Sequence, residues 1–126
     1  KKGNIMSDII LYVLALTLFQ IWLLPMAVNL KNSAYLLSNR DEEVETSVTF
    51  QRIKRAAANL QETLPIFLTL ALLSMFMDVD NTQAATAWLA LRVIHLACYS
   101  FGFAMFRSLS WVGSVIALII MAMELA

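Results

Sequence analysis

The sequence predicts an all-α protein, an integral membrane four-helix bundle that forms one domain over residues 1–126. Composition is the first reason: hydrophobic residues make up 60% of the chain and charged residues 14%, against about 45–50% and 25% in soluble domains. The mean hydropathy of +0.73 agrees with this. The second reason is that apolar stretches long enough to cross a bilayer alternate with short polar segments. We therefore expect lipid to be the main solvent.

Two classes of function are disfavoured by charge and cysteine content. The formal net charge is +0, so nothing in the charge indicates electrostatic binding of nucleic acid, and we expect no nucleic-acid partner. The single cysteine, Cys98, allows neither an internal disulfide nor a cysteine-based metal site, and the sole histidine has no ligand cluster around it. We therefore expect no bound metal.

The first span is expected at about residues 8–30, because no Asp, Glu, Lys or Arg occurs from Ile9 to Leu30. At about 1.5 Å per residue this stretch crosses a hydrocarbon core of about 30 Å. It is too long for the apolar region of a signal peptide, so we expect it to be retained. Pro25 inside it removes a hydrogen bond and invites a kink.

Three further spans follow a polar loop at residues 38–47. A helix from about Val48 to Met77 is polar at its start and uncharged from Thr63 onward. The short segment 78–81 predicts a tight turn, in which Asp78, Asp80 and Asn81 can cap the next helix. The expected spans are residues 55–77, 82–106 and 109–125.

The distribution of cations predicts an orientation. Four spans place both termini on one side of the membrane, and the first and third connections on the other. The termini carry only Lys1 and Lys2, so the positive-inside rule places the long first loop in the cytoplasm and the termini outside. The cations on the loop side are Lys31, Arg40, Arg52, Lys54, Arg55 and Arg107.

Polar residues within the second and third helices form one narrow face on each helix, and we call these two faces together the seam. Residues spaced i, i+4, i+7 or i, i+3, i+7 stay within roughly 60° of one another on a helix. Charges inside a span are unfavourable by about 2.5–3.5 kcal/mol each, so each requires a partner or a function. The seam consists of Arg55, Asn59 and Glu62 on one helix, and Arg92, His95 and Tyr99 on the other.

The depth of these residues predicts an ion pair between Glu62 and Arg92, near the floor of a polar pocket. A seam of this kind could simply hold two helices together. However, the cations near the cytoplasmic ends of these helices outnumber the one carboxylate in the seam, which favours a pocket for a small anionic ligand. In such a pocket Glu62 would be available to an ammonium group of the ligand.

The segment Arg55-Ala-Ala-Ala-Asn59-Leu-Gln-Glu62-Thr-Leu-Pro65 resembles the R-A-x-x-N-x-x-E-x-x-P motif of a known family, the membrane-associated proteins in eicosanoid and glutathione metabolism (MAPEG). The third helix adds Arg92-x-x-His95-x-x-x-Tyr99, followed by Arg107-Ser108, and four spans of this size and order extend the resemblance over the whole chain. The acidic part of the first loop is similar to that of bacterial members, which implies a bacterial inner membrane.

The resemblance implies a homotrimer that binds glutathione between adjacent subunits near the cytoplasmic face. Arg107 of a neighbouring subunit, with Ser108 beside it, would face the sulfur as the catalytic group, because a guanidinium favours a thiolate. The cofactor-binding residues would be Arg55, Asn59, Glu62, Arg92, His95 and Tyr99.

The function expected from this resemblance is a glutathione-dependent transferase or peroxidase acting on hydrophobic electrophiles or lipid hydroperoxides that arrive from the bilayer. Its partners would be glutathione, a lipid-phase substrate, membrane lipids and two further copies of the chain. The alternatives are a non-catalytic lipid-binding or scaffold protein of the same fold, a purely structural bundle, and a channel or transporter. Thiolate absorbance and turnover with glutathione would distinguish the glutathione-dependent enzyme from these alternatives.

Overall fold

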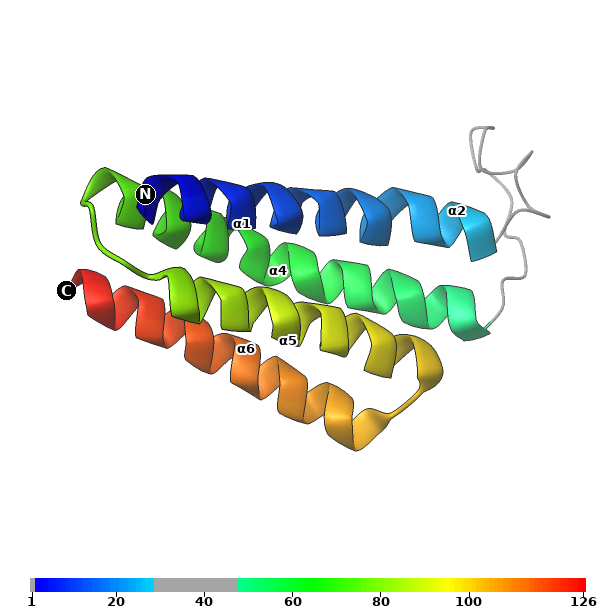
Figure 1. Ribbon diagram of the computed structural model, residues 1–126. Coiled ribbons are helices and arrows are strands. Elements are labelled where there is room, and N and C mark those ends of the chain that lie inside the picture. Colours follow the sequence, from blue (N-terminus) through cyan, green and yellow to red (C-terminus); the bar gives the residue numbers. More distant parts are fainter. Residues whose placement is uncertain (1, 29–47) are drawn as a thin grey trace.

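The computed structural model describes residues 2–28 and 48–126, and these residues form helices joined by two short turns. Figure 1 shows the helices as rods that lie side by side. The first rod is made of α1 (Lys2–Leu18), the π-helix η1 (Phe19–Leu23) and α2 (Leu24–Val28), and the others are α4 (Val48–Phe76), α5 (Thr82–Phe101) and α6 (Ala104–Leu125).

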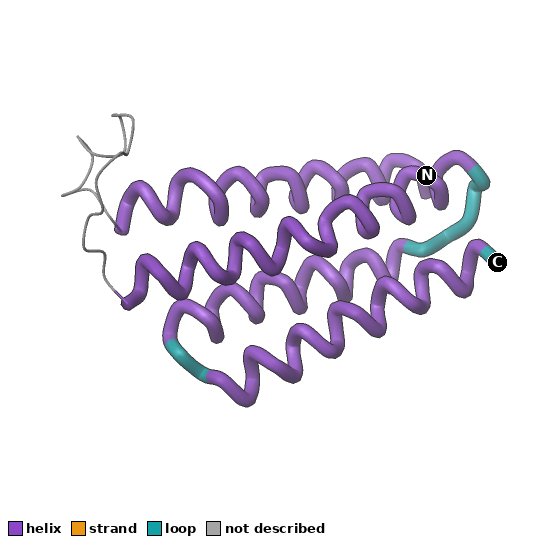
Figure 2. The backbone as a smooth tube through the Cα atoms, turned by 180° about the vertical axis from the view of Figure 1, so that it is seen from behind, coloured by secondary structure: helices purple, strands orange, loops and turns teal. Residues whose placement is uncertain are grey.

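The rods alternate in direction, so the bundle has two distinct ends (Figures 1 and 2). The start of α1, the turn from α4 to α5 and the end of α6 lie at one end, which we call the Asn81 end. The turn from α5 to α6 lies at the other, the Gly102 end, together with the end of α2 and the start of α4. Helix α5 packs against α6, α4 and α1, so side chains on α5 can reach all of its neighbours.

Within the described residues, four helical segments are long and apolar enough to cross a membrane, Ile5–Ala27, Val48–Phe76, Thr82–Phe101 and Ala104–Leu125. Many large apolar side chains on their outer surfaces are exposed in the single chain, among them Leu11, Trp22 and Leu72. An apolar exterior of this extent is suited to lipid rather than water. The predicted four-helix membrane bundle is confirmed.

The buried interior changes character along the bundle axis. Towards the Asn81 end it is mainly an apolar core, centred on Phe67 and Trp88, whose rings stack with centroids 4.1 Å apart, although Ser74 and Asn81 are buried at its edge. Towards the Gly102 end it contains the buried polar side chains of Gln20, Arg92 and His95. The core residues of the apolar half are Met6, Ile9, Val13, Leu60, Phe67, Ala71, Ala85, Trp88, Ala117, Leu118 and Met121.

At the turn between the third and fourth helices, the helix bounds differ from the expected spans of 82–106 and 109–125. Helix α5 ends at Phe101 because Gly102 adopts the left-handed conformation, with φ 82° and ψ 21°. Its N–H donates to Tyr99 O and the Phe103 N–H donates to Cys98 O, which is the Schellman arrangement that satisfies the last carbonyls of a helix. As a result Arg107 and Ser108 lie in the first turns of α6 rather than between two helices.

The first span also differs from its expected bounds of 8–30. It is helical from Lys2, and residues 29–30, like the loop at 38–47, lie outside the described residues. The missing N–H of Pro25 does not break the helix. Instead, the preceding residues form η1, in which the Leu24 N–H donates to Phe19 O. Such π-type adjustments are a known way for a membrane helix to accommodate proline.

Gly102→Ala is expected to lower the free energy of unfolding by about 1–2 kcal/mol, because alanine is strained in the left-handed region. Its Cβ would also lie 3.0 Å from Nη1 of Arg52. The helical Gly113→Ala is the matched control. Its Cβ meets only the mobile end of Leu91, so the change should stay within about 1 kcal/mol of the parent. Unfolding midpoints in mixed detergent micelles measure both, and equal effects would contradict the assignment of strain to Gly102.

Candidate functional site

The predicted site residues all lie in the half of the bundle nearer the Gly102 end, but they differ in burial. Arg92 and His95 are buried, each with 1% of its surface exposed. Asn59, Tyr99 and Arg107 are half-buried. The exposed members are Arg55, Glu62 and Ser108. One chain therefore brings together an inner group and leaves an outer group on its surface.

The two faces of the seam are joined by one hydrogen bond. Arg92 Nη1 donates to Asn59 Oδ1 at 2.8 Å, linking α5 to α4. An amide oxygen is a neutral acceptor, so it satisfies part of the guanidinium's hydrogen-bonding capacity without neutralising its charge. This contact confirms that the two faces of the seam meet, at one position.

The predicted ion pair between Glu62 and Arg92 was wrong. Both residues are described, and no ion pair joins them; Arg92 donates to Asn59 instead. Three residues further along an α-helix correspond to a rotation of about 60° from the starting face. That rotation is enough to take Glu62 off the α4–α5 contact and leave it exposed, whereas Asn59, one turn nearer the Gly102 end, lies within reach of the Arg92 side chain.

Most of the buried polar capacity at this depth is unused. Nε and Nη2 of Arg92 and Nδ1 of His95 are buried and have no hydrogen-bond partner. His95 lies edge-on to the ring of Tyr99, with centroids 5.5 Å apart. Unpartnered buried polar atoms are rare in native proteins and are unfavourable unless a ligand or water completes them. The arrangement therefore offers polar groups to a ligand, because the described residues do not supply partners for them.

Arg107 and Tyr99 meet across the turn at Gly102. The Arg107 Cζ atom lies 4.9 Å from the centroid of the Tyr99 ring, a cation–π contact. The contact depends on the Schellman turn, which brings the last turn of α5 beside the first turn of α6. Because the guanidinium packs on the face of a ring, its N–H groups remain available to an anion. The cation and the ring would form one wall of a site at this end.

A second cation lies over the same turn. The guanidinium of Arg52, from the start of α4, approaches Gly102 closely enough that an added Cβ would meet it at 3.0 Å. Lys54 Nζ sits 5.8 Å from the centroid of the Phe50 ring on the same helix. The start of α4 and the start of α6 thus both bring cations to the Gly102 end, which makes this end attractive to anions.

Sequence reasoning missed Gln20. Its side chain has no exposed surface, it belongs to η1, and neither Nε2 nor Oε1 has a partner. The contact between Ser7 Oγ and Met75 Sδ, at 3.9 Å, shows that these two residues lie at the same depth on the antiparallel first span and α4. Thirteen residues from this level, in the same direction along the bundle, the first span reaches Gln20 and α4 reaches Glu62. Gln20 is therefore at about the depth of the seam. An amide in the middle of an apolar span was the available signal.

One comparison with known proteins identifies a family. The family model described as MAPEG family matches residues 9–126, which is nearly the whole chain. No curated protein sequence matches the chain.

Proposed function

Since this chain belongs to the MAPEG family, we propose that it is an integral-membrane glutathione-dependent transferase or peroxidase that acts on hydrophobic electrophiles or lipid hydroperoxides. The family is associated with glutathione in general, and the chain is a multi-pass membrane protein. The finer assignment, to a reaction class and a set of residues, is supported by the chemistry of the seam.

The observation that carries the proposal is the buried guanidinium of Arg92, with Nε and Nη2 unpartnered beside Asn59. Glutathione has two carboxylates and two amides, so it can supply the acceptors that this group lacks. The residues that would hold the tripeptide are Arg55, Asn59, Glu62, Arg92, His95 and Tyr99.

Arg107 would stabilise the sulfur in its ionised form, with Ser108 beside it. Bound glutathione would supply the thiol nucleophile, so the protein needs no catalytic cysteine, which agrees with the burial of its sole cysteine, Cys98. The guanidinium of Arg107 favours a negative charge within reach of its N–H groups, and the Tyr99 ring orients it.

A homotrimer would bring the exposed members of the set, Arg55, Glu62 and Ser108, against a neighbouring copy, and in that assembly Arg107 would act on glutathione held by the adjacent subunit. The Gly102 end would face the cytoplasm of a bacterial inner membrane, as its cations favour. Glutathione would then enter from water and the second substrate from lipid. Holding the two reactants together at the subunit boundary would raise the rate of the reaction.

Titration of the detergent-purified protein with glutathione tests the proposal. We expect a heat of binding, ultraviolet thiolate absorbance on saturation, and conjugation of a generic aryl halide. A glutathione analogue in which the thiol is replaced by a methyl group should bind with similar affinity and give no absorbance. Binding without thiolate absorbance or turnover would instead identify a non-catalytic lipid-binding or scaffold protein. Absence of any binding heat would leave only a structural bundle.

A further inference from the structure

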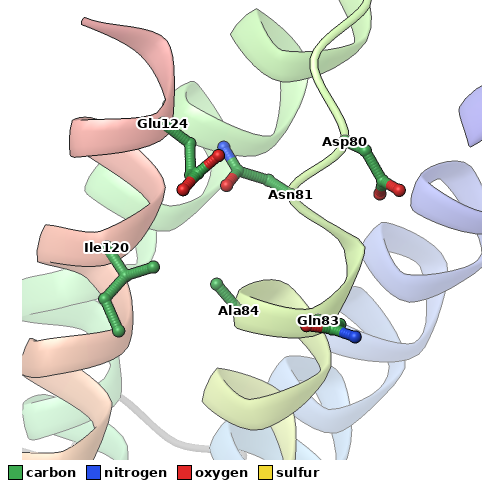
Figure 3. Close-up of a pocket in the computed structure, with 6 residues that line it drawn as sticks. All are labelled: Asp80, Asn81, Gln83, Ala84, Ile120 and Glu124. Carbon is green, nitrogen blue, oxygen red and sulfur yellow. The ribbon is translucent and has the colours of Figure 1, made fainter.

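A cavity of about 310 Å³ lies at the Asn81 end of the bundle, remote from the seam. It opens between the start of α5 and the last turns of α6, as Figure 3 shows. Ala84 and Ile120 give it an apolar wall, and its polar lining carries no cationic side chain. The lining residues are Asp80, Asn81, Gln83, Ala84, Ile120 and Glu124.

Asn81 contributes an unpartnered acceptor to this cavity. It occupies the N-cap position of α5, but its side chain does not cap the helix. Its Nδ2 donates instead to Ser74 Oγ at 2.8 Å and to Met121 O at 3.0 Å, which ties α4, α5 and α6 together. A main-chain carbonyl can only accept, so this contact fixes the orientation of the amide. Oδ1 therefore has no donor, although only 2% of the Asn81 side chain is exposed.

Glu124 adds a negative charge to the lining of the same cavity. In Figure 3 the Asn81 and Glu124 side chains point towards one another, whereas Asp80 points away from them. Asp80 Oδ1 accepts from the Thr82 N–H at 3.1 Å, and so takes the capping role that Asn81 leaves. Among the described residues, no side chain forms a hydrogen bond or ion pair with Glu124.

Glu124 occupies a position in α6 that is unfavourable for a negative charge. It lies in the last turn of α6, where the helix dipole is negative and the last carbonyls lack helical partners, so a carboxylate there is unfavourable without a cation. Glu124 and Asn81 Oδ1 thus present a carboxylate and a neutral acceptor beside the negative end of a helix. A ligand for this site must be a cation that donates hydrogen bonds.

We propose that this cavity binds a primary ammonium group attached to a short carbon chain. An ammonium of this kind has three N–H donors, one for Asn81 Oδ1 and the others for the Glu124 carboxylate and an open carbonyl of α6. The cavity is also much larger than a single water, which occupies about 30 Å³, so it has room for the methylenes beside Ala84 and Ile120. The headgroup of an aminophospholipid and a free alkyl amine share this chemistry.

The test measures thermal unfolding of the whole chain in a nonionic detergent with added ethanolamine or choline at matched ionic strength. Both are cations, but choline has a quaternary nitrogen without an N–H donor. We expect ethanolamine at saturation to raise the unfolding midpoint by several degrees relative to choline, as binding to the native state alone requires. Glu124→Gln should abolish that difference. Asp78→Asn removes an exposed carboxylate from the turn between α4 and α5, outside the cavity lining, and this variant should retain the difference between ethanolamine and choline.

Equal shifts with ethanolamine and choline, or an undiminished shift in Glu124→Gln, would overturn the proposal. So would a midpoint that responds to magnesium chloride but not to ethanolamine, since that result identifies a metal site. Reconstitution into phosphatidylcholine vesicles with and without phosphatidylethanolamine then separates the two sources. Greater stability with phosphatidylethanolamine identifies the lipid headgroup, whereas a response to ethanolamine alone identifies a soluble amine.

Discussion

Replacing Arg107 with alanine is expected to lower conjugation of an aryl halide by glutathione at least about 30-fold at pH 7, because a thiol of pKa about 8.5 is then only about 3% ionised. The guanidinium lies against the Tyr99 ring and keeps its N–H groups free for an anion. If it also holds the sulfur in the transition state, the loss extends to about 100-fold or more. The bundle should remain folded, since Arg107 is half-buried in the first turns of α6.

The pH profile distinguishes loss of this role from a general structural defect. In the parent protein, activity should be nearly flat above pH 7, because the thiolate is already formed. In Arg107→Ala it should rise about tenfold per pH unit until about pH 8.5, as the free thiol ionises. Lys54→Ala, which removes an exposed cation at the same end, is the control and should stay within about twofold of the parent. Full activity in Arg107→Ala would remove the proposed role.

The number and order of the helices could be predicted from the sequence because the bilayer restricts the solutions. A stretch without charges, such as Ile9 to Leu30, has few alternatives to a spanning helix. The bounds were less predictable. The third span was extended past Gly102 on hydrophobicity, since Phe103, Met105 and Phe106 continue the apolar pattern. A glycine followed by apolar residues ends a helix only if the chain turns there, and lipid accommodates both outcomes.

The site was predictable at the level of helix faces. The spacing placed Asn59 and Arg92 on helix faces that meet. It did not show whether Asn59 or Glu62 is the partner of Arg92, because that depends on a helix rotation that sequence periodicity does not resolve. The buried amides of Gln20 and Asn81 are notable because polar atoms on them have no hydrogen-bond partner among the described residues. No pattern in a sequence reports that an amide oxygen is buried and lacks a donor.

Arg92→Met is expected to weaken glutathione binding at least about 30-fold, which corresponds to about 2 kcal/mol, while leaving the unliganded protein as stable as the parent or more so. The reason is that Arg92 is buried with two of its three nitrogens unpartnered. A buried charge with unpartnered donors is itself unfavourable, so an apolar side chain of similar volume in its place should be neutral or stabilising. Unfolding in mixed micelles, with and without glutathione, measures both quantities.

Asn59→Leu should act in the opposite direction, because it leaves the Arg92 guanidinium buried without the amide oxygen to which it donates. We expect a loss of about 1–3 kcal/mol in the free energy of unfolding, and the double variant Asn59→Leu with Arg92→Met should recover it. If Arg92→Met alone destabilises the unliganded protein as much as Asn59→Leu does, then the hydrogen bond between them exists to hold α4 against α5. A buried arginine kept at a cost to stability, by contrast, is the expected signature of a residue retained for its ligand.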